Sequence, residues 1–102
     1  MRTYRVEIDS SARGDIEDLT TWIRNNMSSV GGDRYLDAMK SEINTLSVYA
    51  DLYQLSHYAD IRRFHPKARR MVSHNKKWAY IFHIEEDRVV VDRIISAKLI
   101  TK

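Results

Sequence analysis

The first part of the chain changes from one hydrophobic period to another. Residues 4–8, Tyr-Arg-Val-Glu-Ile, alternate apolar and charged side chains, which predicts a half-buried strand. Asp9 to Ser11 offer side chains that can cap a helix. Apolar residues then recur at steps of three and four, at Ala12, Ile16, Leu19, Ile23 and Met27. We therefore expect a strand that leads directly into an amphipathic helix.

A second amphipathic helix is expected after a glycine turn. Ser28-Ser29 and Gly31-Gly32 predict the end of the first helix, and Asp33 can cap the next one. The apolar stripe of this second helix consists of Leu36, Met39, Ile43, Leu46 and Ala50. A short turn between two such helices predicts an antiparallel hairpin, whose apolar stripes must pack against another layer.

The second half of the chain predicts that other layer. After a connector at residues 51–66, we expect strands at residues 69–74, 76–85 and 88–96, joined by short turns as an antiparallel meander. The last strand is apolar on both faces, which predicts a central position in the sheet. The order of strand, two helices and three strands predicts an α+β fold of two layers, with the helical hairpin on one face of the sheet.

Length and composition set further limits. At 102 residues the chain has the size of one domain, and we expect residues 1–102 to form it. It contains no cysteine, which excludes disulfides and thiolate chemistry. No apolar run approaches the roughly 20 residues of a membrane span, and no signal-peptide pattern is present, so we expect a cytoplasmic protein. Its four histidines show no ligand spacing, and we expect neither a metal site nor a cofactor.

Positive charge is concentrated in one stretch. Residues 61–84 contain seven Lys and Arg and no Asp or Glu, whereas the whole chain has a formal net charge of only +3. Such a stretch can bind a polyanion, dock an acidic partner protein or form a solvated face. The expected binding residues are the basic side chains of this stretch and one near the C-terminus, namely Arg62, Arg63, Lys67, Arg69, Lys76, Lys77 and Lys98.

RNA cleavage is one chemistry that these residue types allow. Attack by a 2′-hydroxyl needs a group that accepts its proton, a cation beside the phosphorane and an acid for the leaving oxygen. Arg70 and Arg93 can stabilise the charge, and His74, His83 or Lys98 can move protons. Two of them have structural alternatives. His83 can be a hydrogen-bonded sheet residue, and Arg93, in an apolar strand, can pair with an acid or face a ligand.

Several motifs occur in a fixed order along the chain. They are Ala12-Arg13-Gly14-Asp15-Ile16 with Leu19 and Trp22-Ile23 in the first helix, Tyr35 to Leu46 in the second, Arg70 or Arg69 opening the second strand, the aromatic strand Trp78 to Ile84, and Arg93-Ile94-Ile95 in the last strand. In this order and spacing the chain resembles the RelE/ParE superfamily of toxins from bacterial type II toxin–antitoxin systems. The resemblance implies a growth-inhibiting toxin in a hetero-oligomer with an antitoxin. That antitoxin would wrap the toxin with a C-terminal segment, often acidic or amphipathic, which would suit the basic stretch.

The resemblance also implies two mechanisms. One branch of the superfamily cleaves mRNA in the ribosomal A site with basic residues and a Tyr or His near the C-terminus, and the other poisons DNA gyrase without nuclease activity. Arg69, Arg70 and Arg93 match the basic set by position, and Lys67 is a looser match. However, Ser96-Ala97-Lys98 stands where many members have a His-Gly-Arg-like turn, and no Tyr or His follows Ile84.

We therefore expect a toxin that poisons DNA gyrase. The alternatives are a ribosome-dependent mRNA endoribonuclease and a non-toxic nucleic-acid-binding module on the same fold. Only the endoribonuclease would be an enzyme, and only then would His74, His83, Arg70 and Arg93 be catalytic. The expected partners are a cognate antitoxin and either DNA gyrase or ribosome-bound mRNA.

Overall fold

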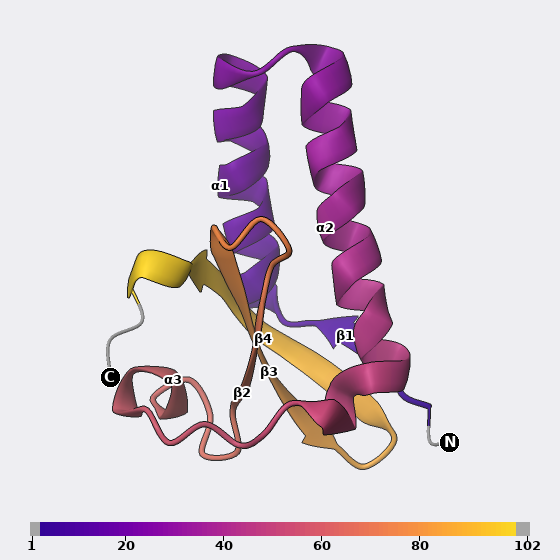
Figure 1. Ribbon diagram of the computed structural model, residues 1–102, viewed down its shortest axis with the longest axis vertical. Helices are drawn as coiled ribbons and strands as arrows, with labels where there is room; N and C mark the ends of the chain where they lie inside the picture. Colours follow the sequence, from indigo (N-terminus) through magenta and orange to yellow (C-terminus); the bar gives the residue numbers. More distant parts are fainter. Residues whose placement is uncertain (1–2, 100–102) are drawn as a thin grey trace.

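The expected order of elements is confirmed. The computed structural model describes residues 3–99, without the side chain of Leu99. The elements are β1 (Arg5–Ile8), α1 (Ser10–Asn26), α2 (Ser29–Tyr49), α3 (Ala59–Arg62), β2 (Arg69–Val72), β3 (Trp78–Glu85) and β4 (Arg88–Ser96), with single 3-10 turns at Ala50–Leu52 and Ala97–Leu99. Figure 1 shows α1 and α2 side by side as a hairpin whose tip extends beyond the sheet. Within residues 3–99, no helix combines the length and apolar character needed to cross a membrane.

The four strands form one mixed sheet in the order β1-β4-β3-β2. The meander of β2, β3 and β4 is antiparallel and β4 lies inside the sheet, as its two apolar faces predicted. The first strand, β1, pairs with β4 in parallel, from Arg5 opposite Arg88 to Ile8 opposite Val91. Because β1 is short, β4 continues beyond it, and α1 runs along the edge of β4 that β1 leaves uncovered.

The prediction of a glycine turn between the two helices is wrong. Helix α2 begins at Ser29, with the side chain of Ser28 accepting a hydrogen bond from the Gly31 amide, so Asp33 is not the cap. Both glycines therefore lie in the first turn of α2. A Cβ at Gly32 would stand 2.5 Å from a methyl carbon of Ile23, which means that this glycine permits close approach of α1 and α2. Gly32 therefore marks close packing of the two helices and not the end of a helix.

Each face of the sheet is covered by a different part of the chain. The helical hairpin packs on the face that carries Tyr80 and Phe82, and together they form the larger core. The connector between α2 and β2 packs Tyr58, Ile61 and Phe64 on the opposite face, in a smaller core that includes Ile81 and Ala79 of β3. The helix layer and the sheet agree with the prediction, and the weakly patterned connector acts as a cover for the second face.

A β-bulge interrupts the pairing of β3 and β4. Ile81 lies opposite Arg93, but the next residue of β3, Phe82, lies opposite Val91, so Asp92 is the extra residue. An unbroken register would place Asp92 opposite Phe82, toward the helical hairpin. The bulge instead allows the side chain of Asp92, the residue that precedes Arg93 in β4, to reach His83. Bulges of this kind redirect side chains and are frequent beside functional sites.

Candidate functional site

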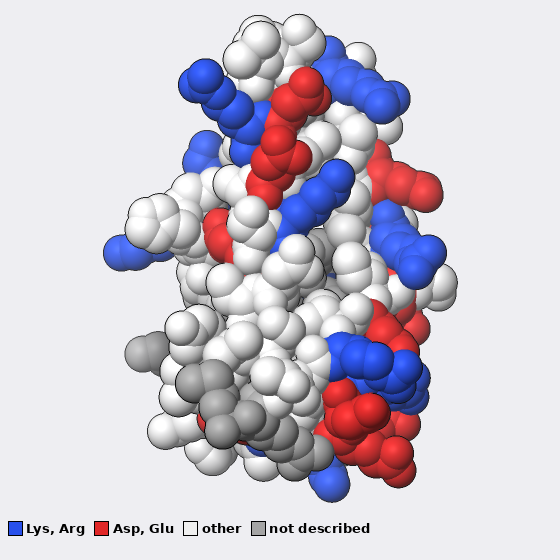
Figure 2. Space-filling view, turned by 90° about the vertical axis from the view of Figure 1, so that its right-hand side faces the viewer, with Lys and Arg blue, Asp and Glu red and all other residues white. Residues whose placement is uncertain are grey.

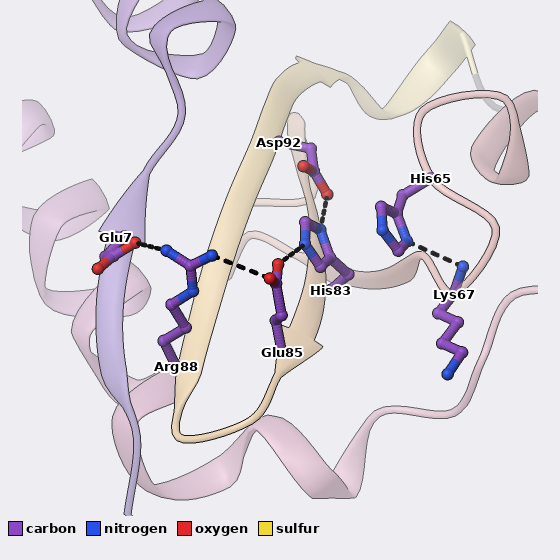
Figure 3. Close-up of polar contacts among 7 residues, drawn as sticks. All are labelled: Glu7, His65, Lys67, His83, Glu85, Arg88 and Asp92. Carbon is purple, nitrogen blue, oxygen red and sulfur yellow. Dashed lines mark hydrogen bonds and ion pairs between the residues drawn. The ribbon is translucent and has the colours of Figure 1, made fainter.

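His83 is the centre of a polar cluster on the connector side of the sheet. Its Nδ1 lies 2.7 Å from the carboxylate of Asp92, and its Nε2 lies 3.3 Å from the carboxylate of Glu85. The ring of His65, from the connector, stacks on it with 3.7 Å between centroids and 2° between planes. His83 is 6% exposed, so the two carboxylates and the second imidazole enclose it. Figure 3 shows this arrangement.

The cluster continues to β1 through an arginine. Arg88 donates to Glu85 at 3.0 Å and to Glu7 at 2.7 Å. The hydrogen bond from Arg88, followed by the contact with His83, lowers the pKa of Glu85. Burial raises the pKa of Asp92, although its hydrogen bond to His83 acts in the opposite direction. The chain Glu7–Arg88–Glu85–His83–Asp92 therefore links β1, β3 and β4 (Figure 3). It borders a surface pocket of about 560 Å³.

Arg93 pairs with an acid on α1. Its Nε and Nη2 donate to the two carboxylate oxygens of Asp15, at 2.8 and 3.0 Å. The same carboxylate accepts the backbone N–H of Ile94 at 2.8 Å, on the edge that β1 leaves uncovered. The contact raises the pKa of the Arg93 guanidinium. The sequence left two interpretations of Arg93, an acid partner or a surface that faces a ligand. The acid partner is present and comes from a helix, and the arginine side chain is still 38% exposed.

The basic residues of the stretch lie on several different elements of the fold. Lys76 and Lys77, in the turn between β2 and β3, line a groove of about 800 Å³ with Lys98. Its lining also includes apolar residues, among them Trp22, which is 54% exposed, and the acidic residues Asp15 and Asp18 of α1. On a different side of the molecule, the side of α2 that lies to the right in Figure 1, Figure 2 shows basic and acidic side chains interspersed. A single basic binding surface stays a prediction.

The other basic residues of the stretch lie on or beside the connector. Arg62, Arg63 and Lys67 are exposed. Arg69 donates to the backbone carbonyl of Tyr53, and its Nε is buried without a hydrogen-bond partner among the described residues. The guanidinium of Arg70 lies 5.3 Å from the ring centroid of Tyr58. Arg69 and Arg70 therefore help to fasten the connector to the edge strand β2.

The four proposed catalytic residues have separate neighbours. His74 is exposed in the turn between β2 and β3, where its backbone N–H donates to Glu42 of α2 at 3.2 Å. His83 contacts the carboxylates of Asp92 and Glu85, Arg93 pairs with Asp15, and Arg70 contacts the ring of Tyr58 in the connector. No group of three or more His, Asp or Glu within residues 3–99 is placed to hold a metal ion.

Comparison with known proteins decides the family. The family model described as the ParE toxin of the type II toxin–antitoxin system, parDE, matches residues 6–99. The chain belongs to the ParE toxin family. Among nine matching chains in solved structures is one from the chromosomal ParDE toxin–antitoxin system of P. aeruginosa, with a TM-score of 0.75 and 10% identity, covering 92% of this chain and 96% of that one. At this identity the structural match shows the fold alone. No curated protein matches the sequence.

Membership of the ParE family confirms the predicted RelE/ParE superfamily. As a member of this family, the chain is the toxin component of a type II toxin–antitoxin system, and its partner is an antitoxin. The motif Ala-x-x-Asp acquires a physical meaning in this structure. Ala12 is fully buried against the core, and Asp15 holds both Arg93 and the edge of β4.

The sequence did not indicate most of the side chains that contact the candidate residues His83 and Arg93 in this ParE toxin. The sequence did not indicate Asp92, because only the bulge in β4 brings it to His83. Glu85 was also missed, although it lies two residues after His83 on β3, and alternation along a strand places both side chains on one face. His65 was noted only as a histidine of the basic stretch. Another available signal was Asp15, because its position in the motif could have been paired with Arg93, a charge in an apolar strand.

Proposed function

We propose that this ParE toxin stops growth by poisoning DNA gyrase, through a protein–protein contact and without a catalytic residue of its own. The proposal is carried by one observation. The residues that could move protons in RNA cleavage do not surround a common space, because His83 and Lys98 line different pockets and His74 is exposed in the β2–β3 turn. Both ring nitrogens of His83 face carboxylates and the residue is only 6% exposed, so a 2′-hydroxyl or a leaving oxygen has little access to either nitrogen.

The remaining catalytic candidates support the same proposal. His74 is exposed beside Glu42, at the end of the β2–β3 hairpin, away from the cluster around His83. The guanidinium of Arg93 already neutralises the carboxylate of Asp15, which reduces the positive charge available to a phosphorane. The end of β4 and the turn after it carry Ser96, Ala97 and Lys98, so the Tyr or His of the ribonuclease branch has no counterpart there.

The binding surfaces follow from the exposed cations and the groove. We assign Arg62, Arg63 and Lys67 on the connector, and Lys76, Lys77 and Lys98 around the groove, to contacts with the antitoxin or with gyrase. Arg69 contributes by holding the connector. The proposed site of action is the cytoplasm, where gyrase works on the chromosome.

Purified components test the proposal. Gyrase, negatively supercoiled plasmid and ATP are incubated with the toxin, and the DNA is analysed after detergent and protease treatment. Linear plasmid that increases with toxin and disappears when the antitoxin is added first is the expected result. In parallel, ribosomes programmed with an mRNA are incubated with the toxin and the 3′ ends are mapped. Cleavage between codons together with an unaffected gyrase reaction would overturn the proposal in favour of the endoribonuclease.

A further inference from the structure

Both tryptophans of the chain line the same groove. Trp22 lies on α1 and Trp78 at the start of β3, and both border the groove of about 800 Å³ described above. Tyr35 of α2 lines it as well, and its hydroxyl accepts a hydrogen bond from the indole N–H of Trp78. Trp22 is 54% exposed, although burial of so large an apolar ring would stabilise the fold. Its ring is therefore available to stack on a flat ligand in the groove.

Three lysines of the groove have no acidic partner. Lys76 and Lys77, from the turn between β2 and β3, and Lys98, from the turn after β4, line the groove and are exposed. None of them takes part in an ion pair within residues 3–99. Two elements that are separated in the sequence thus bring three unpaired cations to the groove that holds the two indole rings.

Lys76 has a backbone conformation that does not suit a lysine. Its φ of 63° lies in the left-handed region, where glycine and asparagine are favoured. Its amide donates to the carbonyl of Ser73 at 2.8 Å and closes the turn, so the hairpin itself requires this conformation. Glycine would meet the requirement without strain. A side chain kept at a strained position points to a function, and this side chain is a cation that lines the groove.

We propose that this groove binds single-stranded nucleic acid, with a base stacked on Trp22 and phosphates beside Lys76, Lys77 and Lys98. The inference goes beyond the proposed function, because it gives the three lysines a ligand in addition to the protein partners considered above. A single strand is needed, since the bases of a duplex are stacked on one another and cannot reach the ring. Stacking and phosphate contacts do not involve the 2′-hydroxyl, so DNA and RNA strands share this chemistry.

The residue types of the lining favour bases and phosphates over the carboxylates of an acidic peptide. All three unpaired cations are lysines, which bind phosphate as point charges, whereas the planar fork of arginine is the better match for a carboxylate. Each nucleotide also supplies a flat base to an aromatic side chain. Of the two acidic residues in the lining, Asp15 is already bound to Arg93, which leaves only Asp18 against the three lysines. The groove therefore keeps a local excess of positive charge.

Tryptophan fluorescence tests the proposal directly. Because the chain has no tryptophan outside the groove, stacking of a base on an indole ring should quench the emission of the full-length protein. The probes are oligo(dT) and oligo(U) of about 10 nucleotides, which is within the range of single-strand binding sites. A glutamate-rich peptide of the same net charge is the competing probe. The expected result is saturable quenching by both oligonucleotides and none by the peptide.

Substitutions in the groove separate its side chains from general charge. The anisotropy of a labelled oligo(dT) gives the affinity of each variant, and thermal unfolding gives its stability. Trp22→Leu should lower the affinity by at least about fivefold through loss of stacking. Lys77→Gln should reduce the slope of log affinity against log salt by about 0.7. Lys40→Gln, an exposed lysine of α2 that lines a different pocket, is the control and should change neither quantity.

Lys76→Gly gives the sharpest result, because binding and stability should change in opposite directions. Glycine relieves the left-handed conformation and should raise the unfolding midpoint, while loss of the cation should weaken oligonucleotide binding. Equal affinity losses in Lys76→Gly and Lys40→Gln would show diffuse attraction to the whole protein and would overturn the groove as the site. Quenching by the glutamate-rich peptide and not by the oligonucleotides would assign the groove to an acidic protein segment and overturn the proposal. Absence of quenching by every probe would overturn it as well.

Discussion

The carboxylate of Asp15 on α1 holds the guanidinium of Arg93 on β4 through two hydrogen bonds, although 78 residues separate the two in the sequence. The same carboxylate accepts the amide of Ile94. One side chain thus satisfies the backbone at the uncovered edge of a central strand and fixes the orientation of a basic residue. The side chain of Asp15 is 16% exposed, so loss of its partner leaves a largely buried charge.

Arg93→Ala should therefore destabilise the toxin. We expect a loss of about 2 kcal/mol in the free energy of unfolding, because the carboxylate of Asp15 retains only the Ile94 amide. Urea denaturation monitored by circular dichroism measures it. Arg88→Ala is the matched control, since the acidic partners of Arg88, Glu7 and Glu85, are more exposed than Asp15 and these ion pairs should contribute less. Equal losses in the two variants would contradict the special position of Asp15.

The two glycines Gly14 and Gly32 should respond to alanine with opposite signs. Gly14 lies inside α1 with open space around its missing Cβ, so Gly14→Ala should stabilise the protein by up to about 1 kcal/mol through helix propensity. Gly32→Ala would place a methyl group 2.5 Å from Ile23, and we expect it to destabilise the protein. Overpacking of this kind costs roughly 1–3 kcal/mol. Thermal unfolding of both variants gives the signs, and a stabilised Gly32→Ala would show that the helices do not pack this closely.

Tyr80 should be replaceable by phenylalanine with a gain in stability. Its side chain is 0% exposed, and its hydroxyl lies near the carboxylate of Glu42 but forms no hydrogen bond of good geometry within residues 3–99. Removing an unsatisfied buried hydroxyl should stabilise the protein by about 1 kcal/mol. Tyr35→Phe is the control. Its hydroxyl accepts hydrogen bonds from Trp78 and Asn75, so the same change should destabilise the protein.

The same residue predicts a dependence on alkaline pH. Burial raises the pKa of Tyr80, and the nearby carboxylate of Glu42 raises it further. A folded-state pKa above that of the unfolded chain means that the unfolded chain ionises first, so stability is lost as the pH rises above about 10. The free energy of unfolding of Tyr80→Phe should fall less between pH 9 and 11 than that of the wild type. Parallel curves would show that Tyr80 does not contribute to alkaline unfolding.

The stacked imidazoles should fasten the connector to the sheet. His65→Ala removes the ring that lies 3.7 Å from His83 and the acceptor of the Lys67 amide. Aromatic pairs contribute roughly 1 kcal/mol beyond their buried area, so we expect a loss of that size. Hydrogen exchange of the amides at residues 61–68 should become faster. His57→Ala, an exposed histidine in the same connector, should change stability by less than about 0.5 kcal/mol.

The elements that were predicted correctly are those with a strong local period. The aromatic alternation of β3, the apolar faces of β4 and the stripes of the two helices are visible in the sequence, because burial on one face imposes them. Gly31 and Gly32 were misread because a glycine pair has the same appearance in a turn as at a close helix contact. Only the position of Ile23 on the other helix distinguishes the two cases.

The site was less predictable because its contacts are not local. No sequence pattern places a bulge at Asp92, so nothing in the order of residues indicated that a carboxylate would reach His83. The contact of Arg93 could not be predicted either, because its partner Asp15 lies on a different element, α1. The parallel pairing of the short β1 decides which edge of β4 the helix α1 covers. Charge, in contrast, is readable from the sequence, but its distribution over the connector and the groove depends on the fold.

The most direct test of the central claim is a timed measurement in living cells. The toxin is induced in a bacterium, and the incorporation of labelled thymidine and labelled amino acids is followed over the first minutes. The account predicts that DNA synthesis stops first and that cleaved gyrase–DNA complexes accumulate, while protein synthesis continues. Protein synthesis that stops first, with mRNA cut at codon boundaries, would contradict it and return His74, His83, Arg70 and Arg93 to consideration as catalytic residues.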